Sequence, residues 1–189
     1  MNETPVLLTI ALIIAFLGST SAFRQFSRGD RIFSRFMSSK KLESPSAERN
    51  KAVIWDVLST KVIPNLPSGD EAANILEVAA GSGVHTAYFG NKCLELDANI
   101  KWFPSDPDPA SLASQQAHID DTPGLVSVMN TPLPLTLSED GIQEAATNEA
   151  LPASVQLVIC INMVHISPWT ATIGLLKESG KRLEKNGIL

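Results

Sequence analysis

Cysteine is scarce in this sequence: Cys93 and Cys160 are the only two in 189 residues. Two cysteines are too few for a disulfide framework, and neither has the short-spaced histidine or cysteine partner that metal sites use. We therefore expect no metal centre, and we expect both thiols to be buried rather than to act as ligands or nucleophiles.

Apolar runs long enough to span a bilayer are also missing. The N-terminal run Val6–Leu17 has twelve residues, whereas a membrane helix needs about 20. Small residues follow it up to Ala22, as in a cleavable signal peptide. The first five residues carry no basic side chain, so an uncleaved signal anchor stays open as the alternative. We expect residues 1–22 to be a signal peptide-like segment and expect no stable membrane span.

Acidic residues are rare in the next segment, residues 23–41, which holds four Arg, two Lys, four Ser and one Asp. Basic, Ser-rich and acid-poor stretches are typical of organelle transit peptides. After a signal peptide, such a segment resembles the bipartite targeting sequences of algal secondary plastids. We expect plastid localisation, with a secretory signal and a basic linker, or a signal anchor, as the alternatives.

Basic residues become scarce after residue 41: residues 42–189 hold nine basic and eighteen acidic residues, for a net charge near −9. Nucleic-acid binding depends mainly on Lys and Arg contacts to phosphate. The composition therefore disfavours nucleic acid as a partner.

The hydrophobic pattern of residues 42–189 predicts an α/β domain with a parallel sheet. Ser44 is suited to cap the first helix, and Pro45 is suited to its first position. Asn186 and Gly187 are suited to end the last helix. The predicted helices cover residues 44–63, 84–95 and 168–187, and an acidic turn that leads into a further helix covers residues 105–119. The predicted strands cover residues 74–79, 99–104, 124–129 and 155–161, and a fifth begins at 188. Because the chain ends there, we expect a domain truncated at its fifth strand.

A turn rich in small residues follows the first predicted strand. Ala79, Gly81 and Gly83 allow a sharp turn and close approach of a ligand to the backbone. The helix that follows offers free N–H groups. Asp106 lies 23 residues after Gly83, near the spacing of an acid that binds a ribose diol. Asp108 is the alternative acid, and a turn without any ligand is the structural alternative.

A third glycine, required by the dinucleotide-binding fingerprint, is absent, since Thr86 stands in its place. The pattern Glu77-x-Ala79-x-Gly81-x-Gly83 instead resembles motif I of the class I S-adenosylmethionine-dependent methyltransferases. That resemblance implies a Rossmann-like fold and S-adenosylmethionine as cofactor. It also implies that the turn faces the methionine part of the cofactor and Asp106 faces the ribose.

Longer strings resemble one family more specifically, the methyltransferase-like protein 26 family. The strings that carry the resemblance occur in order between Ser44 and Leu189: SPSAERNK, ILEVAAGSGVHTAYF, WFPSDPDPASL and CINMVHISPWTATIGLL. The resemblance covers almost all of the predicted domain 42–189.

Polar residues after the fourth predicted strand are the candidates for chemistry. Asn162 is suited to orient an acceptor or the cofactor, and His165 to act as a general base, since an unperturbed imidazole titrates near neutrality. Trp169 is suited to form an aromatic wall or part of the core, and Ser167 to cap the next helix. The structural alternative for His165 is a hydrogen bond to a backbone carbonyl. Arg49 is a candidate partner for the methionyl carboxylate, or part of a solvated helix face.

The sequence therefore predicts an S-adenosylmethionine-binding protein that transfers a methyl group to an unknown small-molecule or protein acceptor. A non-catalytic cofactor-binding or interaction module is the first alternative. A nicotinamide-dependent oxidoreductase is the second, and the missing third glycine counts against it. A hydrolase is set aside because no nucleophile elbow is present.

Overall fold

The computed structural model describes residues 41–66 and 71–189. The predictions for residues 1–22, and for all but the last residue of segment 23–41, lie outside the described residues. In the part of the chain that is described, no helix is long and apolar enough to cross a membrane.

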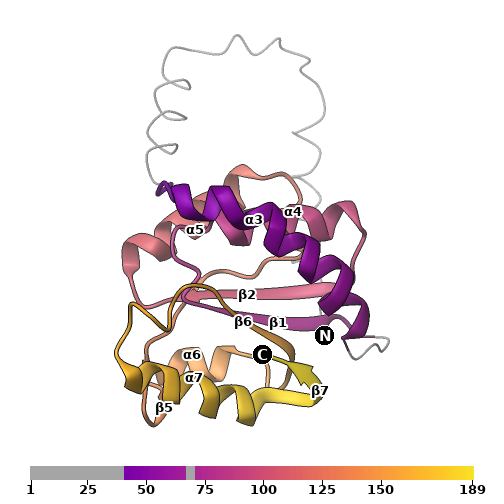
Figure 1. Ribbon diagram of the computed structural model, residues 1–189. Coiled ribbons are helices and arrows are strands. Elements are labelled where there is room, and N and C mark those ends of the chain that lie inside the picture. The colour runs from indigo at the N-terminus through magenta and orange to yellow at the C-terminus, as the bar shows by residue number, and fades with distance from the viewer. Residues whose placement is uncertain (1–40, 67–70) are drawn as a thin grey trace, which may run out of the picture. The chain divides into compact units, whose positions relative to one another are not determined.

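Helices and strands alternate along the described chain, as the α/β prediction requires (Figure 1). The strands of the main sheet are β1 (Ala73–Val78), β2 (Ile100–Asp106), β3 (Leu133–Pro134), β6 (Val155–Cys160) and β7 (Leu183–Ile188). The α-helices are α3 (Pro45–Val57), α4 (Val84–Glu95), α5 (Pro109–Asp121), α6 (Ala145–Ala150) and α7 (Trp169–Arg182). Two short strands, β4 (Leu137–Ser138) and β5 (Gly141–Ile142), pair antiparallel outside this sheet.

The main sheet is parallel and has the order β3-β2-β1-β6-β7. The chain runs outward from β1 through β2 to β3, and then returns to the other side of β1 to form β6 and β7. The strand order therefore reverses between β1 and β6. In open α/β sheets, ligands bind beyond the carboxyl ends of the strands at such a reversal.

Side chains that alternate along β1 divide the core between the two faces of the sheet. Ile75 belongs to a buried cluster with Trp55 of α3 and Phe89 of α4. Leu76 belongs to a second cluster with Leu175 of α7. Helices α3, α4 and α5 thus cover one face of the sheet, and α6 and α7 cover the other (Figure 1).

The N-terminus of α3 forms as predicted. The Ser44 hydroxyl accepts a hydrogen bond from the Ala47 N–H at 3.4 Å, and Pro45 is the first helical residue. This cap fixes the start of α3 next to the β1–α4 turn.

The third predicted strand, residues 124–129, is wrong. Gly124 takes a left-handed conformation with φ 80° and begins a 3-10 turn, Leu125–Ser127. Met129 alone forms a bridge with Trp102, and the edge strand is the later β3. A short apolar run does not by itself distinguish a buried strand from a buried turn.

The predicted end of the last helix is also wrong. Helix α7 ends at Arg182, and β7 begins at once with Leu183. Asn186 has the expected left-handed conformation, with φ 70°, but it lies within β7 and not at a helix end. The pairing of β7 with β6 is irregular between Val155 and Leu157.

Candidate functional site

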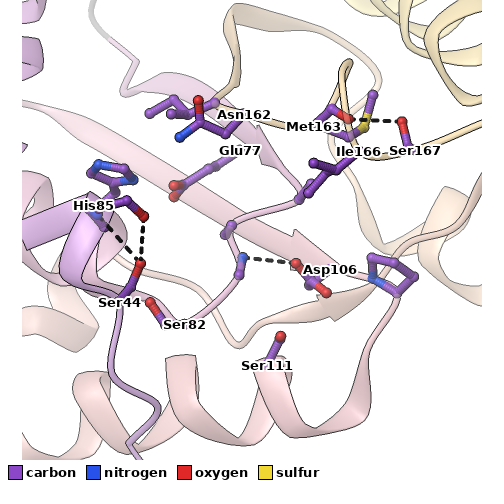
Figure 2. A pocket seen from close by; sticks show the side chains of 17 residues that line it. Ser44, Glu77, Ser82, His85, Asp106, Ser111, Asn162, Met163, Ile166 and Ser167 are labelled. Atoms are coloured by element: carbon purple, nitrogen blue, oxygen red, sulfur yellow. Dashed lines mark hydrogen bonds between the residues drawn. The ribbon is translucent and has the colours of Figure 1, made fainter. Parts of the chain in front are cut away.

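A cavity of about 440 Å³ lies beyond the carboxyl ends of β1, β2 and β6, where the strand order reverses (Figure 2). Its volume falls within the range of small-molecule sites, roughly 300–1,000 Å³. Its walls come from the start of α3, the end of β1 with the β1–α4 turn and the start of α4, the β2–α5 segment and the β6–α7 loop. The lining residues are Ser44, Ser46, Ala47, Glu77, Ala79, Ala80, Gly81, Ser82, His85, Asp106, Pro107, Ser111, Ile161, Asn162, Met163, Ile166 and Ser167.

The β1–α4 turn has three residues in the left-handed region: Ala79 at φ 55°, Gly81 at 57° and Gly83 at 83°. A Cβ atom on Gly83 would lie 2.9 Å from the Cα of Gln115, so the helix α5 backbone requires glycine there. A Cβ atom on Gly81 would meet no atom within 4 Å. Gly81 lines the cavity, so a ligand is able to approach its backbone closely.

Asp106, the predicted ribose ligand, lies at the end of β2 and is buried. Its Oδ2 accepts a hydrogen bond from the Gly81 N–H at 2.8 Å, and its Oδ1 accepts one from the Asp108 N–H at 2.9 Å. Asp108 itself caps α5, where it accepts hydrogen bonds from the N–H and hydroxyl of Ser111, and it does not line the cavity. Asp106 is therefore the acid that the structure places in the site.

Glu77 is buried beneath the same cavity. Its Oε2 accepts hydrogen bonds from the Thr86 hydroxyl at 2.9 Å and from the Trp102 indole N–H at 2.8 Å. Burial raises the pKa of Glu77 to about 7, and the Asp106 carboxylate adds to this, while the two hydrogen bonds oppose it. Near neutral pH this carboxyl is therefore able to exchange its proton for a bound cation.

The β6–α7 loop places one of its two predicted catalytic residues in the cavity wall. Asn162 lines the cavity with a left-handed backbone, φ 64°. His165 is exposed and is not among the lining residues, so its role as a base stays a prediction. Trp169 is 67% exposed, which excludes the core interpretation. Ser167 is not the predicted cap of α7: its hydroxyl donates to the Met163 carbonyl, and Pro168 occupies the cap position.

Arg49 is exposed on α3 and is not among the lining residues. The same helix contributes Ser44, Ser46 and Ala47 to the cavity wall through its first turn. Of the predicted site residues, the structure therefore brings together Asn162 and five from motif I and β2, and leaves out His165 and Arg49. The five are Glu77, Ala79, Gly81, Gly83 and Asp106, with Gly83 supporting the turn from behind.

His85 is a lining residue that the sequence did not single out. It is 8% exposed, and its Nε2 lies 2.8 Å from the Oδ1 of Asn50. One signal was available, because His85 lies two positions after Gly83, in the first turn of a helix that faces the predicted ligand. Its partner on α3 is 35 positions away in the chain, and nothing in the sequence pattern pairs the two.

The charge of the cavity is acidic. Glu77 and Asp106 are its two carboxyls, and within the described residues no Lys or Arg is part of the lining. The described residues also contain no group of three His, Cys, Asp or Glu side chains arranged to hold a metal ion. This lining suits a ligand with positive charge.

Comparison with known protein families gives one match that covers most of the chain. A family model described as "Protein of unknown function (DUF938)" matches residues 41–189. The chain belongs to this family. The DUF938 match begins where the described residues begin, and it includes every lining residue of the cavity.

Solved methyltransferase structures share the fold of this DUF938 protein. A SAM-dependent methyltransferase from Thiobacillus denitrificans, in complex with S-adenosyl-L-homocysteine, is similar with TM-score 0.50, 16% identity and coverage of 84% of this chain and 53% of its own. The DszA carbon methyltransferase is similar with TM-score 0.52, 20% identity and coverage of 87% of this chain and 41% of its own. The apo form of the methyltransferase SibL is similar with TM-score 0.55, 16% identity and coverage of 93% of this chain and 44% of its own. The chain thus spans about half the length of these structures or somewhat less. The predicted Rossmann-like class I methyltransferase fold is confirmed.

Proposed function

We propose that this protein binds S-adenosylmethionine and transfers its methyl group to an acceptor that is a small molecule or a protein. The observation that carries the proposal is the acidic cavity at the reversal of strand order, with the Gly81 backbone open to it and Asp106 at its edge. The shared fold of methyltransferases, one of which holds S-adenosyl-L-homocysteine, supports the choice of cofactor.

The residues of the cavity fit this cofactor. The Asp106 carboxylate would accept hydrogen bonds from the ribose hydroxyls, and Glu77 would face the positively charged sulfur. The open space at Gly81 would admit the methionyl part of the cofactor. When bound, S-adenosylmethionine supplies a methyl group on a positively charged sulfur, which needs no metal ion.

The protein's own contribution would be to position the reactants, which is the main source of acceleration in a direct displacement. Asn162 would orient the acceptor or the cofactor through its amide, from the β6–α7 loop. His165, exposed in the same loop, is a candidate base that would have to turn inward. Arg49 would reach the methionyl carboxylate only by a comparable movement from the surface of α3.

An oxidoreductase that uses a nicotinamide cofactor is disfavoured by charge. The pyrophosphate of such a cofactor would carry negative charge into a cavity that contains two carboxyls and whose described lining includes no Lys or Arg. A non-catalytic cofactor-binding module remains the second candidate, because a fold and a binding site do not by themselves establish turnover.

Two finer proposals rest on the sequence. The strings from SPSAERNK to CINMVHISPW support membership of the methyltransferase-like protein 26 family. The signal-like segment 1–22 and the basic segment 23–41 support delivery to a plastid. A fluorescent protein fused after residue 41 would test this delivery, and secretion of the fusion would contradict it.

Calorimetric titration of the full chain with S-adenosylmethionine and, separately, with NADH tests the proposed function. We expect micromolar affinity for S-adenosylmethionine and no binding of NADH. Binding without methyl transfer to any of a broad panel of amines, thiols, alcohols and peptides would favour the non-catalytic module. No binding by folded protein would overturn the proposal.

A further inference from the structure

We propose that His85, with its tautomer fixed by Asn50, is the base that takes the proton released by the methyl acceptor. This inference rests on the proposed function and assigns a catalytic residue on α4, away from the β6–α7 loop. It also restricts the acceptor to a nucleophile that loses a proton when it is methylated, namely an N–H, O–H or S–H group.

The position of His85 is set by packing on two helices. Its ring stacks on Phe89, one helical turn further along α4, with the centroids 5.5 Å apart and the planes inclined by 13°. On the α3 side, Asn50 Oδ1 lies 2.8 Å from Nε2. Figure 2 shows the imidazole and the Asp106 carboxylate at opposite ends of the cavity, with Glu77 between them. The imidazole is thus held at the end away from the proposed ribose site.

The contact with Asn50 determines which ring nitrogen is free. A carbonyl oxygen only accepts hydrogen bonds, so Nε2 must carry the proton that it donates to Oδ1. In a neutral imidazole the other nitrogen, Nδ1, then has an available lone pair. Within the described residues Nδ1 makes no hydrogen bond. It is also not one of the buried polar atoms without a partner, so this nitrogen is accessible.

Burial favours the neutral form of His85. Burial lowers the pKa of His85, the Lys51 ammonium on α3 lowers it further, and Glu48 on the same helix opposes this. Glu77 on β1 faces the same cavity. At neutral pH the imidazole is therefore ready to accept a proton rather than already holding one.

The proposed step balances as follows. The lone pair of the acceptor atom forms the new bond to the methyl carbon, and the electron pair of the broken carbon–sulfur bond stays on sulfur, which becomes neutral. The acceptor atom then gives up its proton to Nδ1 of His85, and water removes that proton from the imidazolium. An acceptor without a proton to lose, such as a thioether, would not need this base.

The test begins with the state of the ring and needs no acceptor. In the ¹⁵N-labelled full chain, which has three histidines, histidine-to-glutamine variants assign the ring signals. We expect His85 to be neutral at pH 7 with its proton on Nε2. Asn50→Asp places a carboxylate on Nε2 and should raise the pKa of His85 by about 1 or more. Val53→Asp adds the same charge at an exposed position of α3 and should change it by less than about 0.3.

The second half of the test locates His85 relative to the cofactor. With saturating S-adenosyl-L-homocysteine, His85 should still titrate, because the proposed acceptor, and not the cofactor, would lie beside Nδ1. His85→Gln should bind S-adenosylmethionine within about threefold of the wild-type affinity.

Three results would overturn the inference. One is a proton on Nδ1, and another is an equal effect of Asn50→Asp and Val53→Asp. The third is a loss of titration in the complex or a tenfold loss of affinity in His85→Gln, either of which would make His85 a cofactor ligand. If the wild-type protein itself fails to bind S-adenosylmethionine, the proposed function fails and this inference falls with it. That outcome is distinct from a loss confined to the variant.

Discussion

The Asp106 carboxylate accepts a hydrogen bond from the Gly81 backbone N–H at 2.8 Å, and so joins the end of β2 to the turn after β1. The two residues are 25 positions apart in the chain. One oxygen of Asp106 thereby helps to hold the turn that leaves Gly81 open to the cavity. The same carboxylate is the proposed ligand of the ribose, so structure and binding are coupled at this point.

Replacing Asp106 by Ala should weaken S-adenosylmethionine binding by tenfold or more. A hydrogen bond to a charged group contributes about 1.5–3 kcal/mol, and the Gly81 N–H would also lose its acceptor. Calorimetric titration of both proteins measures the change. Asp108→Asn is the matched control, because Asp108 caps α5 outside the cavity lining. An equal loss of affinity in both variants would refute the specific role of Asp106.

Glu77 should make the stability of the protein depend on pH. Its pKa is about 7 in the folded state against 4.5 for the ordinary group, so the folded protein binds more protons in this window. Its contribution is complete below pH 4.5 and is lost as pH rises through 7. Glu77→Gln removes this pH-dependent contribution to stability. The glutamine keeps an oxygen that accepts the hydrogen bonds from Thr86 and Trp102.

Denaturant unfolding of the wild type and Glu77→Gln between pH 5 and 8 measures this effect. As pH rises, the free energy of unfolding of the variant should increase relative to that of the wild type. The increase should be on the order of 3 kcal/mol if the whole pKa difference between the folded and unfolded states contributes. The difference between the two proteins is the quantity to follow. His85 and His118, whose pKa values are lowered, add an opposite slope that both proteins share. Parallel curves would show that Glu77 is ionised throughout.

Binding of the cofactor should release a proton from Glu77. A cation beside a carboxyl lowers its pKa, and near pH 7 about half of the Glu77 population is protonated. Calorimetry at pH 7 in phosphate and in Tris, whose ionisation enthalpies differ, should show release of up to about half a proton per ligand. Glu77→Gln should release less. The same release in both proteins would assign the proton to another group.

Local signals in the sequence predicted the β1–α4 turn, the start of α3 and three strands of the sheet. The small residues from Ala79 to Gly83 predicted the turn, and the spacing to Asp106 predicted an acid at the same site. The hydrogen bond from Gly81 to Asp106 was not predicted. The Ser44-Pro45 pair predicted the start of α3, and the apolar runs predicted β1, β2 and β6. Apart from the spacing between Gly83 and Asp106, each of these signals lies within one element or at its end.

The errors come from interactions between distant parts of the chain. The apolar run 124–129 packs as a 3-10 turn, with Leu125 in the core cluster of α3 and α4, and so does not become a strand. The sequence missed His85 as a lining residue for the same reason. The position of His85 depends on its contact with Asn50 and on the fold that brings α3 to α4.

The backbone of Ala79 is left-handed, with φ 55°. This conformation costs an L-residue roughly 1–2 kcal/mol, so Ala79→Gly should be neutral or slightly stabilising. Ala80 has no positive φ, and Ala80→Gly should lose about 0.5–1 kcal/mol through the greater freedom of the unfolded chain. Thermal unfolding of the two variants compares them directly. A lower Tm for Ala79→Gly than for Ala80→Gly would show that the turn carries no strain.

Gly81 and Gly83 should respond differently to alanine, although both have positive φ. In Gly83→Ala the new Cβ would lie 2.9 Å from the α5 backbone at Gln115. That clash adds to the backbone cost, so the variant should lose more than about 2 kcal/mol of stability. In Gly81→Ala the Cβ meets no atom within 4 Å, so the loss of stability should be the backbone cost of roughly 1–2 kcal/mol alone.

The affinity of Gly81→Ala for S-adenosylmethionine should nevertheless fall, because the alanine methyl group would enter the space proposed for the ligand. Unfolding and calorimetric titration of each variant separate the two effects, and unchanged affinity in Gly81→Ala would show that the cofactor does not pass over this turn.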